Sequence, residues 1–369
     1  MHITLIAGAR PNFIKIAPLV HAIQQAQTNG KDIEYRLVHT GQHYDKNMSD
    51  TFFEELHIPM PDANLGCGGG TQAEQTAAIM VAFEKELMAH PTDLVLVVGD
   101  VTSTMACSIV AKKMNTRVTH VEAGIRSWDL TMPEEINRMV TDCLADFYFT
   151  TSEVANQNLR NAGVSENRIH FVGNVMIDTL RANEGQFVKP EIFDELQLQN
   201  GEYIVMTLHR PANVDEADKL RDLVNQITSN VQNEPIVFPI HPRTARIFRY
   251  LGIHAENLHI VDPLGYLEFN YLVKHARAVV TDSGGITEET TVMGVPCFTL
   301  RNNTERPETC TIGTNELIGT NPKNIAPALK TLYAGQWKKG AIPPLWDGHT
   351  AERIIDILLK NAAWNSSLS

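Results

Sequence analysis

The chain has 369 residues, of which 43% are hydrophobic and 20% charged, and its formal net charge is −12. This composition is typical of a globular protein, and the length is sufficient for two domains that each bury a core. The acidic excess argues against a general nucleic-acid-binding surface, because Lys and Arg predominate on such surfaces. A small anionic ligand remains compatible with the charge, since a few well-placed cations suffice to hold one.

The five cysteines are scattered and form no C-x-x-C pair, which predicts reduced thiols. No secretory signal precedes the first strand pattern, and no apolar run approaches the length of a membrane span. We therefore expect a cytoplasmic protein.

Along the first half, short apolar runs alternate with amphipathic segments, the pattern of parallel strands and covering helices. The predicted strands are residues 1–7, 35–40, 93–98, 119–121, 147–151 and 170–172, and the clearest predicted helices span 71–88 and begin at 133. Residues 66–70 are rich in glycine, but no strand directly precedes them and no Gly-Lys-Ser/Thr follows. We interpret them as a connection or lid rather than a nucleotide P-loop.

Charged residues follow the strands of this half. Arg10 and Lys15 flank the first turn, Asp100 and Glu122 follow two buried strands, and Glu134 opens a helix. Ligands of open α/β sheets collect at the carboxyl ends of the strands. Any one of these carboxylates is most often a helix cap or an ion-pair partner. Three of them at one edge favour general acid and base chemistry.

From about residue 182 to residue 201 the alternation is lost, which predicts a domain linker. Strands then recur at 203–207, 236–240, 259–261, 276–281 and 295–300, with helices at 220–231, 266–274 and 350–359. We predict an N-terminal domain (1–181), a C-terminal domain (182–349) and a final helix (350–369) that packs back on the first. The fold class is α/β, with two Rossmann-like doubly wound domains facing across a cleft.

The segment from Asp282 to Glu289 follows a buried strand and places Ser283, Gly284 and Gly285 at a helix start. Backbone N–H groups at such a start suit a phosphate, although any strand–helix junction needs a tight glycine turn. Arg306, just downstream, would bring a guanidinium to the same edge. A lone histidine at a strand end, such as His209, is usually an ordinary hydrogen-bonded residue. Here it would face the glycine turn, where it could neutralise a departing phosphate.

The chain carries a series of distinctive motifs: Gly8-Ala9-Arg10-Pro11 with Lys15, Thr40-Gly41-Gln42-His43, Gly99-Asp100, His120-Val121-Glu122-Ala123-Gly124-Ile125-Arg126, Pro133-Glu134-Glu135-Ile136-Asn137-Arg138, His209-Arg210, Asp282-Ser283-Gly284-Gly285 with Glu288-Glu289, and Thr304-Glu305-Arg306-Pro307-Glu308. Taken together, these motifs resemble the non-hydrolysing UDP-N-acetylglucosamine 2-epimerases. The resemblance covers nearly the whole chain, from about residue 3 to the Asp347-Gly348 and Arg353-Ile354 tail.

The resemblance implies a fold like that of the two-domain (GT-B) nucleotide-sugar glycosyltransferases, a homodimer, and no metal or nicotinamide cofactor. The implied reaction interconverts UDP-N-acetylglucosamine and UDP-N-acetylmannosamine, through elimination of UDP to an enzyme-bound 2-acetamidoglucal and readdition to the other face. A C2 proton far from any carbonyl is barely acidic, so departure of the C1 phosphate must help it leave. The site therefore needs carboxylates at the sugar and cations at the diphosphate.

Carried over residue by residue, the resemblance places Asp100, Glu122 and Glu134 at the sugar, with one as C2 base and another as acid or cation stabiliser. It places His209 and Arg10 near the diphosphate and Ser283, Gly284 and Gly285 in the diphosphate loop. Glu289 would contact the ribose, Phe269 the uracil side, and Lys15 and Arg306 would be further substrate contacts. Two departures, Ala212 in place of a Glu and Asp45 where many bacterial members have Gln, argue against the activation by a second substrate molecule found in some members.

Three alternatives remain open on the sequence. Residues 132–138 and 47–49 look somewhat like the subgroup that acts on UDP-2,3-diacetamido uronic acids. A glycosyltransferase would use the same twin-domain cleft, although it needs fewer carboxylates. The third alternative is a non-catalytic nucleotide-sugar sensor.

Overall fold

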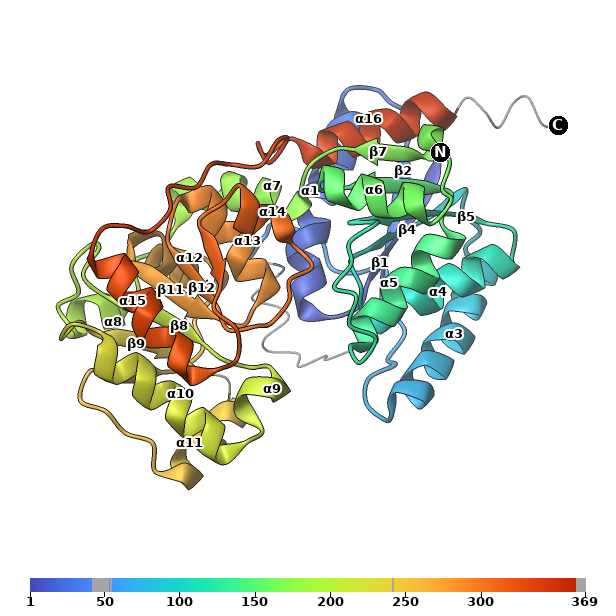
Figure 1. Ribbon diagram of the computed structural model, residues 1–369. Coiled ribbons are helices and arrows are strands. Elements are labelled where there is room, and N and C mark those ends of the chain that lie inside the picture. Colours follow the sequence, from blue (N-terminus) through green and yellow to red (C-terminus); the bar gives the residue numbers. More distant parts are fainter. Residues whose placement is uncertain (42–52, 54, 241, 363–369) are drawn as a thin grey trace. The chain divides into compact units, whose positions relative to one another are not determined.

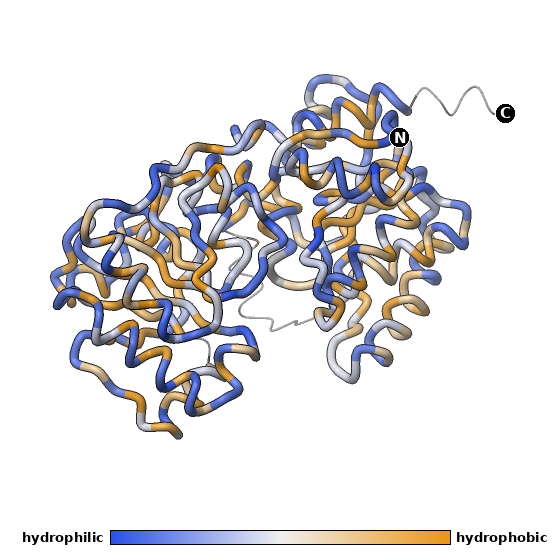
Figure 2. The backbone as a smooth tube through the Cα atoms, viewed as in Figure 1, coloured by the Kyte–Doolittle hydropathy of each residue, from blue (hydrophilic) through white to orange (hydrophobic). Residues whose placement is uncertain are grey.

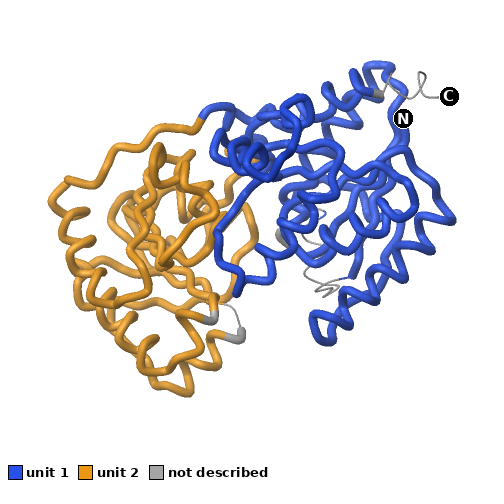
Figure 3. The backbone as a smooth tube through the Cα atoms, turned by 45° about the vertical axis from the view of Figure 1, so that its right-hand side comes forward, with its two compact units in different colours: residues 1–182, 344–369 blue, residues 183–343 orange. Residues whose placement is uncertain are grey.

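The structure is a computed structural model that describes residues 1–41, 53, 55–240 and 242–362 (Figure 1). The chain divides into two compact units, which we call unit 1 (Met1–Ala182 with Pro344–Ser369) and unit 2 (Asn183–Pro343) (Figure 3). Each unit contains one sheet whose described strand pairs are all parallel, and helices connect most successive strands in the described ranges. The predicted α/β, doubly wound class is therefore confirmed.

Unit 1 has seven strands in the order β3-β2-β1-β4-β5-β6-β7. Their bounds are β1 His2–Ala7, β2 Glu34–His39, β3 Ala63–Asn64, β4 Leu94–Val98, β5 Arg117–Val121, β6 Phe147–Thr150 and β7 Ile169–Phe171. The central strand β4, Leu-Val-Leu-Val-Val, is buried at every position. Strands buried on both faces read as continuous apolar runs, which is why the sequence predicted this one well.

The helices of unit 1 are α1 Arg10–Thr28, α3 Gln72–Ala89, α4 Thr102–Lys113, α5 Pro133–Leu144, α6 Glu153–Asn161, α7 Val175–Asn183 and α16 Thr350–Ala362. The last of these, α16, packs beside α1. Two contacts anchor it: the Trp346 indole donates to the Thr151 carbonyl at 3.0 Å, and the Ala351 amide donates to the Asp178 carboxylate at 2.6 Å.

Unit 2 has six strands in the order β10-β9-β8-β11-β12-β13. Their bounds are β8 Ile204–Thr207, β9 Ile236–Pro239, β10 Leu258–Val261, β11 Ala278–Thr281, β12 Cys297–Thr299 and β13 Asn315–Leu317. The helices are α8 Glu191–Glu195, α9 Pro211–Val214, α10 Ala217–Asn230, α11 Pro242–Leu251, α12 Tyr266–His275, α13 Gly284–Met293, α14 Pro307–Thr311 and α15 Ile325–Tyr333. Short 3-10 turns span Glu166–Arg168 in unit 1 and Glu184–Gln186 and Pro322–Asn324 in unit 2.

Hydrophobic burial holds each unit together. In unit 2, Ile204, Phe238 and Val280 of the sheet pack with Leu223 and Ile227 of α10 in one buried cluster. Figure 2 shows hydrophobic and hydrophilic residues alternating along the helices, as expected where one face of a helix covers a sheet. No helix within the described ranges has the length and apolar character needed to span a membrane.

The structure departs from the sequence prediction in three places. Strands β3 and β13 were not predicted, and β3 ends two residues before the glycine-rich segment 66–70, which therefore does follow a strand. Residues 183–201, predicted to form a linker, include the helix α8.

The strand orders fix where a ligand site is expected. Strand β1 lies between β2 and β4, so the connections leave it in opposite directions, and β8 lies likewise between β9 and β11. Ligands of doubly wound sheets bind at such switch points, beyond the carboxyl ends of the strands. The loops and helix starts that follow β1, β4, β8 and β11 carry half of the predicted site residues, namely Arg10, Asp100, His209, Ser283, Gly284 and Gly285.

Candidate active site

The predicted residues of unit 1 leave three neighbouring strands. Arg10 begins α1 after β1, Asp100 follows β4, and Glu122 follows β5. The side chain of Arg10 lies outside the described part of the structure. The motif residues Gln42 and His43 and the segment 45–49 lie outside it as well.

Lys15 and Glu122 form an ion pair with a separation of 2.6 Å between Nζ and Oε2. Their side chains are 13% and 2% exposed, so the pair is largely shielded from water. Gly99 lies against it, because a Cβ atom there would come within 3.3 Å of both charged atoms. The cation predicted to contact the substrate therefore also stabilises the buried carboxylate.

Glu122 has a left-handed backbone, with φ of +71°. A non-glycine residue pays strain energy for this conformation, and such residues cluster at functional sites. Gly124, two residues on, has φ of +77°, and a Cβ atom there would lie 2.4 Å from the Ala155 carbonyl oxygen. The Glu-Ala-Gly turn thus needs its glycine and holds the glutamate in a fixed orientation.

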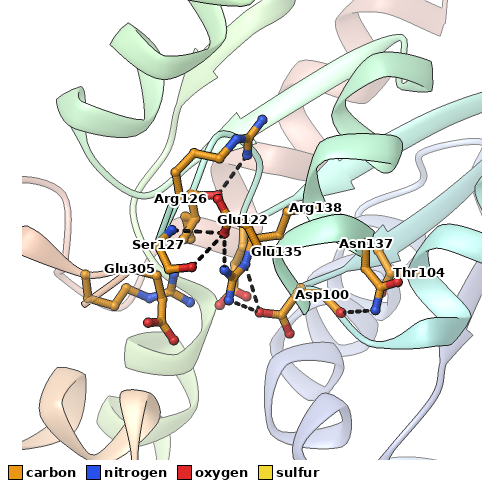
Figure 4. Close-up of polar contacts among 12 residues, drawn as sticks. Asp100, Thr104, Glu122, Arg126, Ser127, Glu135, Asn137, Arg138 and Glu305 are labelled. Atoms are coloured by element: carbon orange, nitrogen blue, oxygen red, sulfur yellow. Dashed lines mark hydrogen bonds and ion pairs between the residues drawn. The ribbon is translucent and has the colours of Figure 1, made fainter. Parts of the chain in front are cut away.

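Asp100 is anchored by α5 (Figure 4). Arg138 donates to Asp100 Oδ2 from Nε at 3.0 Å and from Nη2 at 2.5 Å, and Asn137 donates to the Asp100 carbonyl at 2.8 Å. The Asp100 side chain remains 26% exposed. It is therefore a carboxylate held by a guanidinium at the surface of unit 1, accessible to a ligand.

Glu134 and Glu135 differ sharply in their surroundings. Glu134 is exposed, and within the described ranges no hydrogen bond or ion pair joins it to Asp100 or Glu122. Glu135 is fully buried and accepts from the Ser127 amide at 2.9 Å and from Arg138 at 2.7 Å. The role assigned to Glu134 stays a prediction, and Glu135 is a structural member of the cluster that the sequence missed.

In unit 2, Asp282 gathers the loops after β8 and β11. The two strands are paired in register at Thr207 and Thr281. The carboxylate accepts from the backbone amides of His209 and Arg210, and the Nδ1 atom of His209 lies 2.8 Å from Oδ1. Burial alone would raise the pKa of Asp282, but the contact with His209 and the amide donors more than offset it, so the pKa is lowered.

This pairing orients the imidazole of His209. With Nδ1 directed at a buried carboxylate, the 53% exposed side chain presents its other nitrogen to solvent. An Asp–His pair of this kind fixes the tautomer and orientation of the ring. The sequence placed His209 beside the glycine turn, but gave Asp282 no role.

Ser283, Gly284 and Gly285 form the turn into α13. Ser283 is the residue before the helix, its side chain makes no capping bond, and residues 283–286 are only partly buried. The first backbone N–H groups of a helix lack partners within it and favour an anion. This turn is therefore suited to hold a phosphate group.

Glu289, one turn further into α13, is 4% exposed and accepts a 3.0 Å hydrogen bond from the Tyr266 hydroxyl. Burial raises the pKa of Glu289 to about 7, although the bond from Tyr266 opposes the rise. Phe269, on the same helix as Tyr266, is partly buried against the apolar cluster of unit 2. Tyr266 and Phe269 lie on α12, which packs against α13.

Arg306 is buried and ion-paired with Glu288, the neighbour of Glu289 on α13. Next to it, Arg301 and Glu305 form a second buried pair at 2.6 Å, and a Cβ atom on Gly284 would lie 3.1 Å from a Glu305 oxygen. Within unit 2, then, the guanidinium of Arg306 braces the helix that carries the glycine turn. Its predicted contact with a nucleotide stays a prediction.

One feature of the sequence could have revealed the supporting residues that our prediction missed. Helix α5 buries a polar face and leaves apolar residues outside; the buried polar positions are Glu135, Asn137, Arg138, Thr141 and Asp142. The spacing of three and four places them on one side of a helix. A helix whose polar side must face the sheet indicates a charged site beneath it.

Comparison with known proteins gives a consistent result. The family model described as UDP-N-acetylglucosamine 2-epimerase matches residues 25–359. The chain is 38% identical over 371 residues to the UDP-N-acetylglucosamine 2-epimerase of Methanocaldococcus jannaschii, with 97% of this chain and 99% of that protein covered. It is 40% identical over 336 residues to the UDP-2,3-diacetamido-2,3-dideoxy-D-glucuronate 2-epimerase of Pseudomonas aeruginosa, with 90% and 92% covered.

Solved structures agree with these sequence matches. The M. jannaschii UDP-GlcNAc 2-epimerase in complex with UDP-GlcNAc and UDP has a TM-score of 0.87 at 38% identity, covering 98% of this chain and all of that one. The Neisseria meningitidis UDP-GlcNAc 2-epimerase bound to UDP-GlcNAc has a TM-score of 0.88 at 29% identity, with the same coverage. The resemblance drawn from the sequence motifs is therefore confirmed.

Proposed function

The chain belongs to the UDP-N-acetylglucosamine 2-epimerase family of isomerases, and we propose that it interconverts UDP-N-acetylglucosamine and UDP-N-acetylmannosamine. The observation that carries the proposal is the pair of carboxylates after adjacent strands of unit 1, Asp100 and Glu122, each held by a cation. Inverting C2 requires a proton to leave one face of the sugar and to arrive on the other. Two fixed carboxylates provide a base and an acid for that exchange.

The proposed reaction proceeds by elimination and readdition. A carboxylate of unit 1 takes the C2 proton, a C1=C2 double bond forms, and the C1–O bond breaks so that UDP leaves with its electron pair. A proton is then returned to the opposite face of C2, and the UDP oxygen attacks C1 to restore the bond. No net oxidation occurs, so the sequence of steps needs no redox cofactor.

We assign UDP binding to unit 2. The turn from Ser283 to Gly285 would hold the diphosphate with backbone amides, and His209, oriented by Asp282, would donate to it as negative charge develops on the leaving group. Glu289 would accept from the ribose hydroxyls, with Phe269 on the uracil side. Arg10 and Lys15 of unit 1 and Arg306 of unit 2 complete the proposed contacts, and Glu134 is proposed as a third carboxylate at the sugar.

A second substrate is favoured by one observation, the 40% identity to the Pseudomonas aeruginosa enzyme named for UDP-2,3-diacetamido-2,3-dideoxy-D-glucuronate. The test is a comparison of kcat/KM for both UDP-sugars, with the C2 epimer of each detected by proton NMR. We expect UDP-N-acetylglucosamine to be preferred by at least about tenfold. Turnover of the uronate alone would overturn the assignment, and UDP release only on addition of an acceptor would indicate a glycosyltransferase.

We also propose that two copies associate through the outer face of α3, α4 and α5, which lie side by side (Figure 1). Because α5 buries its polar side, Ile136 and Met139 are 48% and 39% exposed. A hollow of about 600 Å³ lies on this face, lined by Ile109, Lys112, Lys113, Met139, Val140, Cys143 and Leu144. Exposed apolar side chains gathered on one face of a protein are typical of protein–protein contacts.

Sedimentation of the purified protein tests the dimer. Met139→Lys is expected to give a monomer, because it places a charge in the apolar contact. The matched control is Val154→Lys on α6, which is 48% exposed elsewhere on unit 1 and should leave the dimer intact. A wild-type monomer at micromolar concentration would contradict the proposal.

All five cysteines are unbonded, which supports our further proposal of a cytoplasmic location.

A further inference from the structure

His120 lies at the centre of unit 1 and has not been given a role above. It is the fourth residue of β5 and is completely buried. Its Nδ1 atom lies 2.7 Å from Asp142 Oδ1, and its Nε2 atom lies 2.9 Å from the carbonyl oxygen of Gly99. Both ring nitrogens are thus directed at oxygen atoms within hydrogen-bonding distance.

The two oxygens set the hydrogen bonding of the ring. A backbone carbonyl oxygen only accepts, so Nε2 must carry a proton to bond it. On the Nδ1 side, Asp142 is a carboxylate ion-paired with Arg126. Its Oδ2 already accepts from Arg126 at 2.6 Å and from the Gly124 amide at 3.1 Å. Both ring nitrogens therefore face oxygen atoms that serve as hydrogen-bond acceptors.

A second histidine of the same sheet shows the contrast. His170 on β7 packs against Phe147 and Phe149, and its buried Nε2 atom has no hydrogen-bond partner in the described part of the chain. Burial lowers the pKa of His170, as expected for a ring with no carboxylate beside it. The two histidines, on strands separated by β6, thus have different surroundings: His120 faces two oxygen atoms and His170 packs against aromatic rings.

The group that His120 holds on its Nε2 side is the peptide that leads into Asp100. Gly99 is clamped at both ends by β5, because its amide donates to the Val121 carbonyl at 3.0 Å while its carbonyl accepts from His120. The same glycine lies against the Lys15–Glu122 pair. A rotation of this peptide would therefore move Asp100 directly and disturb the packing beneath Glu122.

On its Nδ1 side, His120 helps to fix the loop that carries Glu122. Asp142 binds His120, the Gly124 amide and Arg126, so it holds residues on both sides of the strained glutamate. The charged group that contacts the ring is Asp142 on α5; Arg126 pairs with Asp142, and the Lys15–Glu122 pair and Asp100 adjoin Gly99. Tyr148 of β6 donates to the Asp142 carbonyl.

We propose that His120 is a positioning residue for the epimerase reaction: held as an imidazolium between Asp142 and the Gly99 carbonyl, it fixes the backbone that presents Asp100 and Glu122. The inference rests on the proposed function, because it takes those two carboxylates as the groups that act on the sugar. His120 itself contacts neither substrate nor reacting atoms. Removing it should lower kcat through misplacement, while leaving nucleotide binding in unit 2 intact.

The charge of the ring is tested by NMR of the full-length protein carrying ¹⁵N-labelled histidine at pH 7.5. We expect one ring with protons bonded to both nitrogens, absent from the spectrum of His120→Asn. An ordinary histidine at this pH is mostly neutral. A His120 ring with one unprotonated nitrogen would overturn the inference. This measurement does not depend on turnover, so failure of the proposed function and failure of this inference are distinguishable.

The positioning role is tested by kinetics of two neutral variants. His120→Gln can keep a donor toward Gly99, and His120→Asn can keep one toward Asp142, but neither carries charge. We expect kcat to fall roughly 10- to 100-fold in both, as small misplacements of catalytic groups do. The dissociation constant of UDP should stay within about twofold of the wild type. His170→Asn is the matched control and should keep the wild-type kcat.

Either neutral variant that folds and keeps kcat within about twofold of the wild type would overturn the positioning role. An equal loss of kcat in His170→Asn would do so too, because it would show that any histidine removed from this sheet has the same effect. If one neutral variant does not fold, the other variant and the NMR spectrum of the wild type still decide the question.

Discussion

Replacing Glu289 by Gln is expected to stabilise unit 2 while weakening its nucleotide site. Burial raises the pKa of this carboxyl group from 4.5 to about 7. A group with a raised pKa binds more protons in the folded state, so its stabilising effect is complete below pH 4.5 and is lost as the pH rises through about 7. The rise is equivalent to about 3 kcal/mol at pH 8. Glutamine avoids this loss and still accepts the hydrogen bond from Tyr266.

Calorimetry at two pH values isolates the effect. For a domain the size of unit 2, about 3 kcal/mol corresponds to an increase in Tm of roughly 6–12 °C at pH 8. At pH 5 wild-type Glu289 is protonated, so the variant and the wild type should differ little. Glu256→Gln, the same change at an exposed position of unit 2, is the control and should leave Tm unchanged at both pH values.

UDP binding should move in the opposite direction. A hydrogen bond to a charged acceptor contributes about 1.5–3 kcal/mol, so loss of the carboxylate should weaken UDP binding at pH 8 by roughly 10- to 100-fold. Titration calorimetry measures this change. The reasoning is refuted if Glu289→Gln shows no gain in Tm at pH 8, or an equal gain at pH 5 and pH 8.

Two further substitutions test the buried ion pairs. Lys15→Met removes the lysine that pairs with the buried Glu122, so it should lower the free energy of unfolding by about 3–5 kcal/mol and abolish turnover. Urea denaturation should show that adding Glu122→Gln restores most of the lost stability. A double variant with no restored stability would argue against the pair. Arg306→Ala should weaken UDP binding and also destabilise unit 2 by about 3–5 kcal/mol, because Glu288 loses its guanidinium partner. Normal stability with weakened binding would instead indicate that Arg306 acts only on the nucleotide.

Most of the fold could be predicted from the sequence because both sheets are parallel and buried. Val95, Leu96 and Val97 form a continuous apolar run that few other structures accommodate. The strands that escaped prediction lie at sheet edges. Strand β13 is Asn-Glu-Leu and β3 is only Ala-Asn, so neither has the β-branched or apolar pattern that marks a strand.

The site residues that follow strand ends could be predicted from the sequence. Those on helices could not, because the rotation of the helix determines which side chains face inward. Asp100, Glu122, His209 and Ser283 each lie within two residues of a strand end, and the parallel topology places those ends at one edge of each sheet. By contrast, Glu134 and Glu135 are adjacent in the sequence, and only the packing of α5 turns Glu135 inward. The contacts of Asp142 and Asp282 likewise depend on loops that meet only in the folded chain.

The most direct test of the account is proton NMR of UDP-N-acetylglucosamine turnover in heavy water by the wild type and by Asp100→Asn. We expect the wild type to place solvent deuterium at C2 of both epimers. In Asp100→Asn this exchange should be at least about a hundredfold slower while UDP binds with wild-type affinity, as loss of a proton-transfer group predicts. Epimerisation that retains the C2 hydrogen, or exchange by Asp100→Asn at the wild-type rate, would contradict the account.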